Sequence, residues 1–183
     1  MHILEGKPLI VASVLLVVVL VVATWTDVTA RRIPNWLTVS AIVAGLAVRA
    51  WMGLAPLGNG ALGLAVACLL ALPFFAMGVL GGGDAKLLMG VGAFMGPADI
   101  ARASLVIAVV GGVLALVEAA RRRVLVPTLA SCGLLIVSWV TLGRRGRGHG
   151  QLIVGGGARL AVPYGVAIAA GSLLWWFGGG LAS

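Results

Sequence analysis

The chain is poor in charged residues, and acidic residues are the scarcest. Of its 183 residues 10% are charged, and the acidic ones are only Glu5, Asp27, Asp84, Asp99 and Glu118. By contrast, 61% of the residues are hydrophobic. This composition excludes an ordinary soluble domain, in which about a quarter of the residues carry charge. Apolar stretches approaching ~20 residues recur along the sequence, as bilayer-spanning helices require.

Cysteine is nearly absent as well. Cys68 and Cys132 stand alone within apolar segments without C-x-x-C spacing, so the sequence indicates neither a zinc site nor a disulfide framework. We expect both to be small buried hydrophobic side chains. His2 and His149 are not accompanied by a set of possible ligands. No metal site and no organic cofactor is therefore predicted.

Positive charge is in excess, with a formal net charge of +8. The Arg and Lys residues gather in short segments between apolar runs. This distribution follows the positive-inside rule of membrane proteins, whereas nucleic-acid binding would need a basic face. We therefore expect the lipid bilayer, and not a nucleic acid, as the partner of these charges. No helix face stands out as an oligomer interface, so the oligomeric state stays open.

The apolar runs predict an all-α, polytopic membrane bundle of about six transmembrane helices. We expect a single membrane domain over residues 1–183, with no soluble domain. A Gly/Pro/Asn turn is predicted at 53–60, Pro73 is expected to kink the third helix, and Arg49 is expected to reach the lipid headgroups. The predicted spans are 9–25, 36–51, 61–80, a shorter one from about 85 to 95, 100–120 and 160–177.

Two segments allow more than one interpretation. Basic clusters flank segment 124–142 on both sides, which favours an interfacial or re-entrant position, although its hydrophobicity argues for crossing. The first apolar run could be a secretory signal cleaved after 28–30, but it is longer than a typical signal core and more spans follow. With the N-terminus outside, the basic segments after the first, third and fifth spans all lie in the cytoplasm.

Two of the five acids lie at helix ends on this cytoplasmic side. Asp27 is at the exit of the first span, and Asp84 follows the glycines 81–83 at the start of the fourth. A carboxylate among apolar helices costs several kcal/mol unless a partner or a task justifies it. Two close carboxylates hold one proton between them, so one can act as general base and the other as general acid in peptide hydrolysis. The charges of the helix ends favour ionised Asp84 and protonated Asp27.

The neighbouring residues suit such a site. Gly81 to Gly83 can adopt positive φ and let another backbone approach closely. Pro34 gives a rigid turn, and Asn35 is expected to cap the second helix. The structural alternatives are that Asp84 is a helix N-cap, that Asp27 pairs with Arg31 four residues later, and that the glycines form a flexible joint.

Together these residues resemble the type IV prepilin peptidases, membrane aspartic proteases with a G-x-G-D motif. The matching residues are Gly81, Gly83 and Asp84, then Lys86, and upstream Asp27 with Arg31, Ile33, Pro34 and Asn35. The segment 162–169, which contains Pro-Tyr-Gly, is similar to the last span of that family. The resemblance covers roughly residues 9–120 and 160–178.

The resemblance implies a catalytic pair, Asp27 and Asp84, in an enzyme of the bacterial inner membrane that removes the leader peptide of prepilins at the cytoplasmic face. Gly81, Gly83, Lys86, Arg31, Pro34 and Asn35 would then shape the substrate site. Larger members of the family carry a cysteine-rich, zinc-binding insert, which this chain has no room for. It therefore resembles the short, cleavage-only branch that serves Flp-type (tight-adherence) pilins, although segment 124–142 is usually less apolar in that branch.

Two functions of other classes stay open at this point. A small transporter or proton-relay protein could use Asp27 and Asp84, but a relay should place its acids at different depths in the bilayer. A non-catalytic pilus-assembly subunit could have kept the same fold. Activity of variants at either aspartate distinguishes these alternatives from a peptidase.

Overall fold

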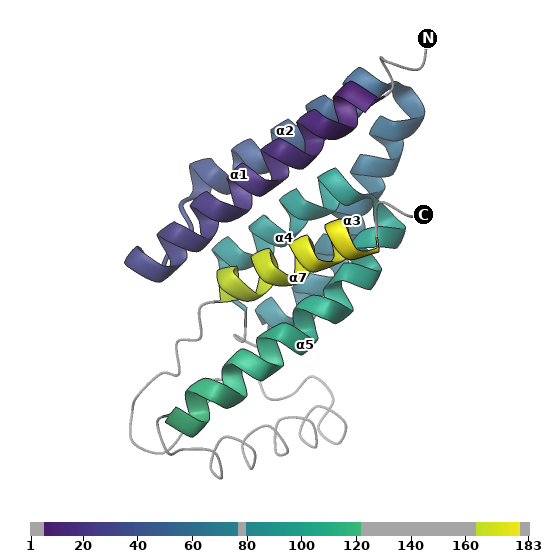
Figure 1. Ribbon diagram of the computed structural model, residues 1–183. Helices are drawn as coiled ribbons and strands as arrows, with labels where there is room; N and C mark the ends of the chain where they lie inside the picture. The colour runs from purple at the N-terminus through teal and green to yellow at the C-terminus, as the bar shows by residue number, and fades with distance from the viewer. Residues whose placement is uncertain (1–5, 77–79, 122–163, 180–183) are drawn as a thin grey trace. The chain divides into compact units, whose positions relative to one another are not determined.

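The computed structural model describes residues 6–76, 80–121 and 164–179, and its secondary structure there is entirely helical (Figure 1). This confirms the predicted all-α class. The predicted segment 124–142 lies outside the described residues. Within them, the helices are α1 (Gly6–Ala30), α2 (Asn35–Met52), α3 (Leu54–Ala76), α4 (Gly82–Met95), α5 (Pro97–Arg121) and α7 (Tyr164–Gly178).

Helices α1, α2, α3 and α5 are long and apolar enough to cross a membrane. Helices α4 and α7 have only 14 and 15 residues, fewer than the ~20 that span a bilayer without help. The chain divides into two compact units, residues 1–111 with 163–183, and residues 112–162. The second unit is described only in the final turns of α5, so the predicted single domain over 1–183 stays a prediction.

Two of the helix connections are single glycines. Gly53 (φ 128°) joins α2 to α3, and Gly96 (φ 88°) joins α4 to α5. Both lie in the region of positive φ that glycine adopts without a steric penalty. The predicted turn at 53–60 is therefore wrong, because α3 begins at Leu54. Pro56 fits there, since the first N–H groups of a helix have no partner within the helix.

Arg49 lies in the last turn of α2, but its guanidinium does not extend away from the bundle. Its Nε and Nη2 donate to the carbonyl oxygen of Phe94 at 3.0 and 2.7 Å. This carbonyl is in the last turn of α4, where helix carbonyls lack partners within the helix. The predicted contact of Arg49 with lipid headgroups stays a prediction, while two of its three guanidinium nitrogens bond the end of α4.

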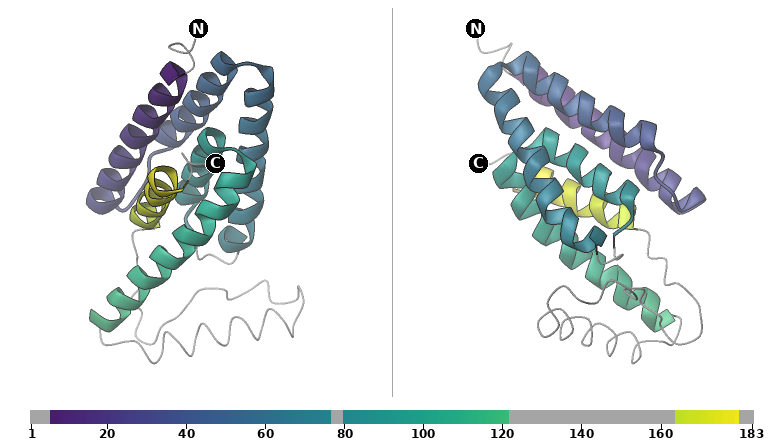
Figure 2. Two further views of the ribbon diagram at one scale, coloured as in Figure 1. Left: turned by 45° about the vertical axis from the view of Figure 1, so that its right-hand side comes forward. Right: turned by 180° about the vertical axis from the view of Figure 1, so that it is seen from behind.

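Helix α4 is enclosed by other helices in the first compact unit. It contacts α1, α2, α3 and α7 (Figures 1 and 2). Its contacts are made through glycine: a Cβ at Gly90 would lie 2.9 Å from Ala41 Cβ, and one at Gly92 would lie 2.8 Å from Ala67 Cβ. Small residues let membrane helices approach closely. The start of α4 is consequently held on a closely packed frame.

Helix α7 is attached to its neighbours near its C-terminal end. Trp176 Nε1 donates to Ser13 Oγ of α1 at 3.0 Å, and Trp175 Nε1 donates to Asp99 Oδ1 of α5 at 3.4 Å. Trp176 is buried. These side-chain bonds fix α7 along α1, which determines what its N-terminal end can reach.

Candidate active site

Three helix ends meet at one end of the first compact unit. Asp27 is in the last turn of α1, Asp84 is the third residue of α4, and Gly165 is the second residue of α7. Gly165 contacts Asp27 directly, and the charge of Asp27 acts on Asp84. The two aspartates selected from the sequence thus lie together.

Asp27 is a buried acid with a backbone partner. Its side chain is 8% exposed, and its Oδ2 accepts a hydrogen bond from the backbone N–H of Gly165 at 2.8 Å. The start of a helix carries partial positive charge, which favours a negative group there. The structural alternative of an ion pair with Arg31 is not observed between these two described residues, which share only the backbone bond from Arg31 N–H to the Asp27 carbonyl oxygen at 2.9 Å.

Asp84 differs in that it also feels the charge of the other acid. Its partial burial, together with repulsion by Asp27, raises its pKa from 3.8 to about 6, although a hydrogen bond from the Gly81 backbone works against the shift. The expectation from helix ends alone, that Asp84 is the acid more easily ionised, is therefore wrong. Burial and the nearby negative charge outweigh the favourable helix start. Asp84 is also not the N-cap of α4, since Gly81 occupies that position.

Gly81 and Gly83 are needed for space and not for positive φ. Gly81 has an ordinary extended conformation, with φ −69° and ψ 152°. A Cβ at Gly81 would lie 2.8 Å from Asp84 Oδ2, and one at Gly83 would lie 3.1 Å from both the Cβ and the carbonyl oxygen of Ile33. The predicted positive φ is wrong, but the predicted close approach of another backbone is found, and it comes from the α1–α2 connection.

The other predicted site residues surround this connection. Lys86 Nζ donates to Asn35 Oδ1 at 3.0 Å, which links α4 to the start of α2. Asn35 does not cap α2, because Pro34 is at the N-cap position and no side chain bonds the helix start. Arg31 is exposed and has φ 50°, a left-handed conformation that ends α1 and is costly for a residue with a Cβ.

Gly165 is the site residue that the sequence did not indicate. From the sequence, the Pro-Tyr-Gly segment was only a point of resemblance to the family, and no contact between this segment and Asp27 was predicted. The contribution of Gly165 is an amide N–H, which every residue except proline carries. Residue type therefore holds no signal for this contact, and only the packing of α7 on α1 reveals it.

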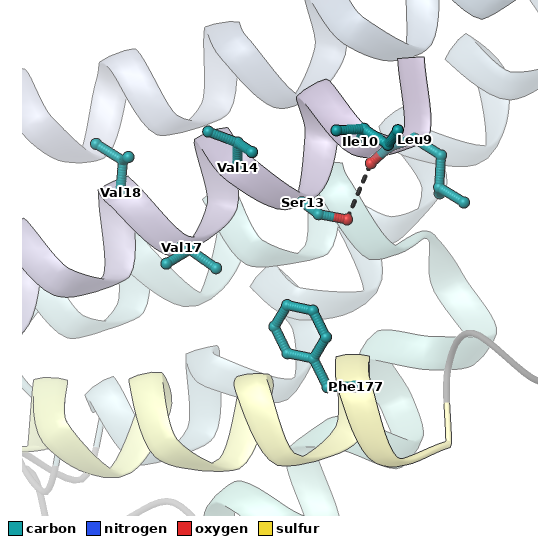
Figure 3. A pocket seen from close by; sticks show the side chains of 7 residues that line it. All are labelled: Leu9, Ile10, Ser13, Val14, Val17, Val18 and Phe177. Carbon is teal, nitrogen blue, oxygen red and sulfur yellow. Dashed lines mark hydrogen bonds between the residues drawn. The ribbon is translucent and has the colours of Figure 1, made fainter. Parts of the chain in front are cut away.

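Two apolar hollows lie on the described surface, one separate from the acids and one beside Asp27. A groove of about 440 Å³ is lined by α1 between Leu9 and Val18 and by Phe177 of α7 (Figure 3). Its nearest residue, Val18, is nine residues before Asp27, about 13 Å along the helix. A second groove, of about 300 Å³, includes Thr24 and Val28 on either side of Asp27. Neither is lined by a titratable side chain.

The described residues suit acid–base chemistry by two carboxyl groups. Among residues 6–76, 80–121 and 164–179, no three His, Cys, Asp or Glu side chains gather in a way that could hold a metal ion. Asp27 has a hydrogen-bond donor that stabilises its charge, while Asp84 holds its proton more tightly than an ordinary aspartate. Such a difference in environment assigns base and acid roles in a carboxylate pair.

A sequence model of the type IV leader peptidase family matches residues 14–116. The matched stretch is more than half of the chain and includes both aspartates. It confirms the resemblance to prepilin peptidases, while the Flp-type branch stays a prediction. No curated protein and no solved structure matches the chain significantly.

Proposed function

This chain belongs to the type IV leader peptidase family and is therefore a membrane protease of prepilins, and from that premise we propose that it cuts its substrate by an aspartic mechanism. Asp27 and Asp84 are the catalytic pair in this proposal. Ionised Asp27 takes a proton from the attacking water. Protonated Asp84 donates its proton to the peptide carbonyl oxygen, which gives a gem-diol. When the C–N bond breaks, Asp27 passes the proton it took from water to the leaving amine, and Asp84 takes a proton back from the gem-diol, so both acids return to their starting states.

The observation that carries the proposal is that the last turn of α1 and the first turn of α4, two helices in contact, bring Asp27 and Asp84 close enough for their charges to interact. The charge of Asp27 contributes to the raised pKa of Asp84, and the hydrogen bond from Gly165 stabilises that charge. At a pH near or below about 6, the pair can thus hold one proton in all, on Asp84. That is the state in which general base and general acid are both ready.

We further propose the cytoplasmic face of the bacterial inner membrane as the location of the site. Arg31, Arg32 and Lys86 are exposed at this end of the helices, and basic residues accumulate on the cytoplasmic side. The substrate is a Flp-type prepilin, whose leader is cut at the edge of its hydrophobic helix. Gly81, Gly83, Pro34 and Asn35 shape the floor on which the scissile peptide lies. With only two cysteines, the chain does not have the zinc-binding insert of the larger members.

The proposal is tested by co-expression with a Flp-type prepilin and by measuring leader removal. Asp27→Asn and Asp84→Asn should each lower the cleavage rate by about 10³-fold or more, because each removes one half of the acid–base pair. Asp99→Asn is the matched control: Asp99 is bonded to Trp175 on another part of α7, and its variant should cleave within about twofold of wild type.

Cleavage by either catalytic variant at a wild-type rate would refute the aspartic mechanism. If both variants and the wild type leave the prepilin intact while the precursor still assembles into pili, the chain is a non-catalytic subunit. Purified variants should elute as wild type does in detergent, so that lost activity is not confused with lost folding. A proton relay is disfavoured, because Asp27 and Asp84 lie at the same end of the bundle and not at different depths.

A further inference from the structure

The start of α7 reaches Asp27 from 138 residues away in the sequence. Gly165 N–H donates to Asp27 Oδ2 at 2.8 Å within a buried environment. The same helix is fixed to α1 near its other end by the bond from Trp176 to Ser13. Because α7 is attached to α1 at both ends, the position of this donor relative to the carboxylate is set by the fold.

The approach leaves no room for a side chain at position 165. A Cβ there would lie 2.7 Å from Asp27 Oδ2 and 3.1 Å from both Asp27 Cβ and Cγ. Contacts below about 3 Å between carbon and oxygen atoms that are not hydrogen-bonded are strongly repulsive. Only glycine offers its amide at hydrogen-bond distance without pushing the carboxylate away.

We propose that Gly165 is a positioning residue for the reaction, which holds Oδ2 of Asp27 so that Oδ1 is left to accept the proton of the attacking water. The inference rests on the proposed function, in which Asp27 is the base. A carboxylate that receives a backbone N–H bond is favoured in its ionised form. The first turn of α7 therefore determines both the orientation of the base and its readiness to accept a proton.

The test is the pH–rate profile of leader cleavage by Gly165→Ala. The methyl group displaces the carboxylate, and a misplacement of about 1 Å can cost about 10²-fold in rate. We expect kcat to fall by about 10- to 100-fold, with KM for the prepilin changed less than about threefold. The acidic limb of the profile should move to higher pH by about half to one unit, because the ionised base loses its donor.

Other charged groups are unchanged in this variant. Gly165→Ala changes no charged side chain, so a shift of the acidic limb of the pH–rate profile can be attributed to the altered hydrogen bond between Gly165 and Asp27. In the described parts of the elements that pack against the end of α1, the titratable or charged side chains near the site are Asp84, Lys86, Arg31, Arg32 and Tyr164.

Two variants of the same helix serve as controls. Gly178→Ala adds a methyl group where nothing lies within 4 Å, and its profile should match wild type. At Gly171 a Cβ would lie 2.6 Å from Ile107 Cγ1, so Gly171→Ala disturbs the packing of α7 on α5 without touching Asp27. It should lower thermal stability and yield but leave the acidic limb where it is in wild type.

A measurement without catalysis covers the case in which Gly165→Ala does not fold. In wild-type protein labelled with [15N]glycine, the Gly165 amide resonance should shift as Asp27 is titrated, and this shift should be absent in Asp27→Asn. The inference is overturned if the amide resonance does not respond to pH, or if Gly165→Ala keeps the wild-type kcat and acidic limb while Asp27→Asn is inactive. Cleavage by Asp27→Asn would overturn the proposed function instead.

Discussion

At the residue scale, the site depends on giving two identical side chains different surroundings. Asp27 is the more deeply buried, but it receives a backbone N–H from a helix start. Asp84 also begins a helix, yet burial and the charge of Asp27 raise its pKa to about 6. In the proposed mechanism, the same carboxyl group would thus serve as base at one position and as acid at the other, because a single shared proton relieves the repulsion between the pair.

This raised pKa predicts a dependence of stability on pH. An aspartate whose pKa is higher in the folded than in the unfolded protein binds its proton more tightly when folded, so stability falls as pH rises from 3.8 to about 6. Above that range the whole cost of the buried charge is present. Asp84→Asn removes it, and we expect the melting temperature at pH 7.5 to rise by about 2–4 °C.

Thermal unfolding in detergent between pH 4 and 8 measures this effect. The gain from Asp84→Asn should shrink towards zero near pH 4, where wild-type Asp84 is protonated. Asp99→Asn should show no such trend. A gain that is equal at pH 4 and pH 7.5, or a loss at pH 7.5, would contradict the assigned environment of Asp84.

Whether a site residue can be predicted from the sequence depends on how rare its residue type is in the chain. Asp27 and Asp84 could be selected because acids are scarce and both follow apolar runs. Which of them is the more readily ionised could not be derived, because that depends on burial and on the distance between them. Gly165 could not be predicted as a site residue for another reason. It contributes only a backbone amide, and it is one of 28 glycines in the chain.

At the scale of the helices, glycine determines how closely elements pack. Gly63 of α3 faces the end of α4, where a Cβ would overlap the carbonyl oxygen of Gly92 and lie 2.7 Å from Gly96 Cα. The sequence predicted a turn up to residue 60 because it contains Gly, Pro and Asn. In a helix pressed against another helix, however, small residues are favoured by the contact itself.

A pair of glycine variants in α3 tests this interpretation. Gly63→Ala should destabilise the protein by about 1–3 kcal/mol through overpacking. Gly58→Ala, in the same helix but with nothing within 4 Å of the added Cβ, should be neutral or stabilise by about 0.5–1 kcal/mol. Thermal unfolding in one detergent compares the two, and equal effects would show that contact with α4 is not the cause.

At the scale of the whole molecule, composition alone predicted a helical membrane protein, and the structure confirms it in the described residues. Four helices there have the length and hydropathy of spans. The shorter helix predicted to end near residue 95 agrees with α4, whereas α3 begins at Leu54, seven residues before its predicted start. Hydropathy reports whether a residue avoids water, and not whether a neighbouring helix or lipid covers it.

The orientation in the membrane is a prediction at this scale. In a cysteine-free background, a membrane-impermeant maleimide should label Arg32→Cys only from the cytoplasmic side, because Arg32 is exposed beside the site. Leu54→Cys should be labelled only from outside, since Leu54 is 87% exposed and begins α3 at the opposite end of α2. Inverted membrane vesicles and intact spheroplasts separate the two faces, and the reversed pattern would place the acids outside.

The three glycines at the acids have a consequence for how such an enzyme can change over evolutionary time. A Cβ at Gly81 or Gly165 would collide with a carboxyl oxygen, and one at Gly83 would crowd Ile33. Substitution of these glycines is disfavoured because any Cβ would be too close to its neighbours, and this holds for every precursor that the enzyme cleaves. New preferences among precursors are expected instead at exposed neighbours such as Arg31 and Lys86, whose side chains do not bond either acid.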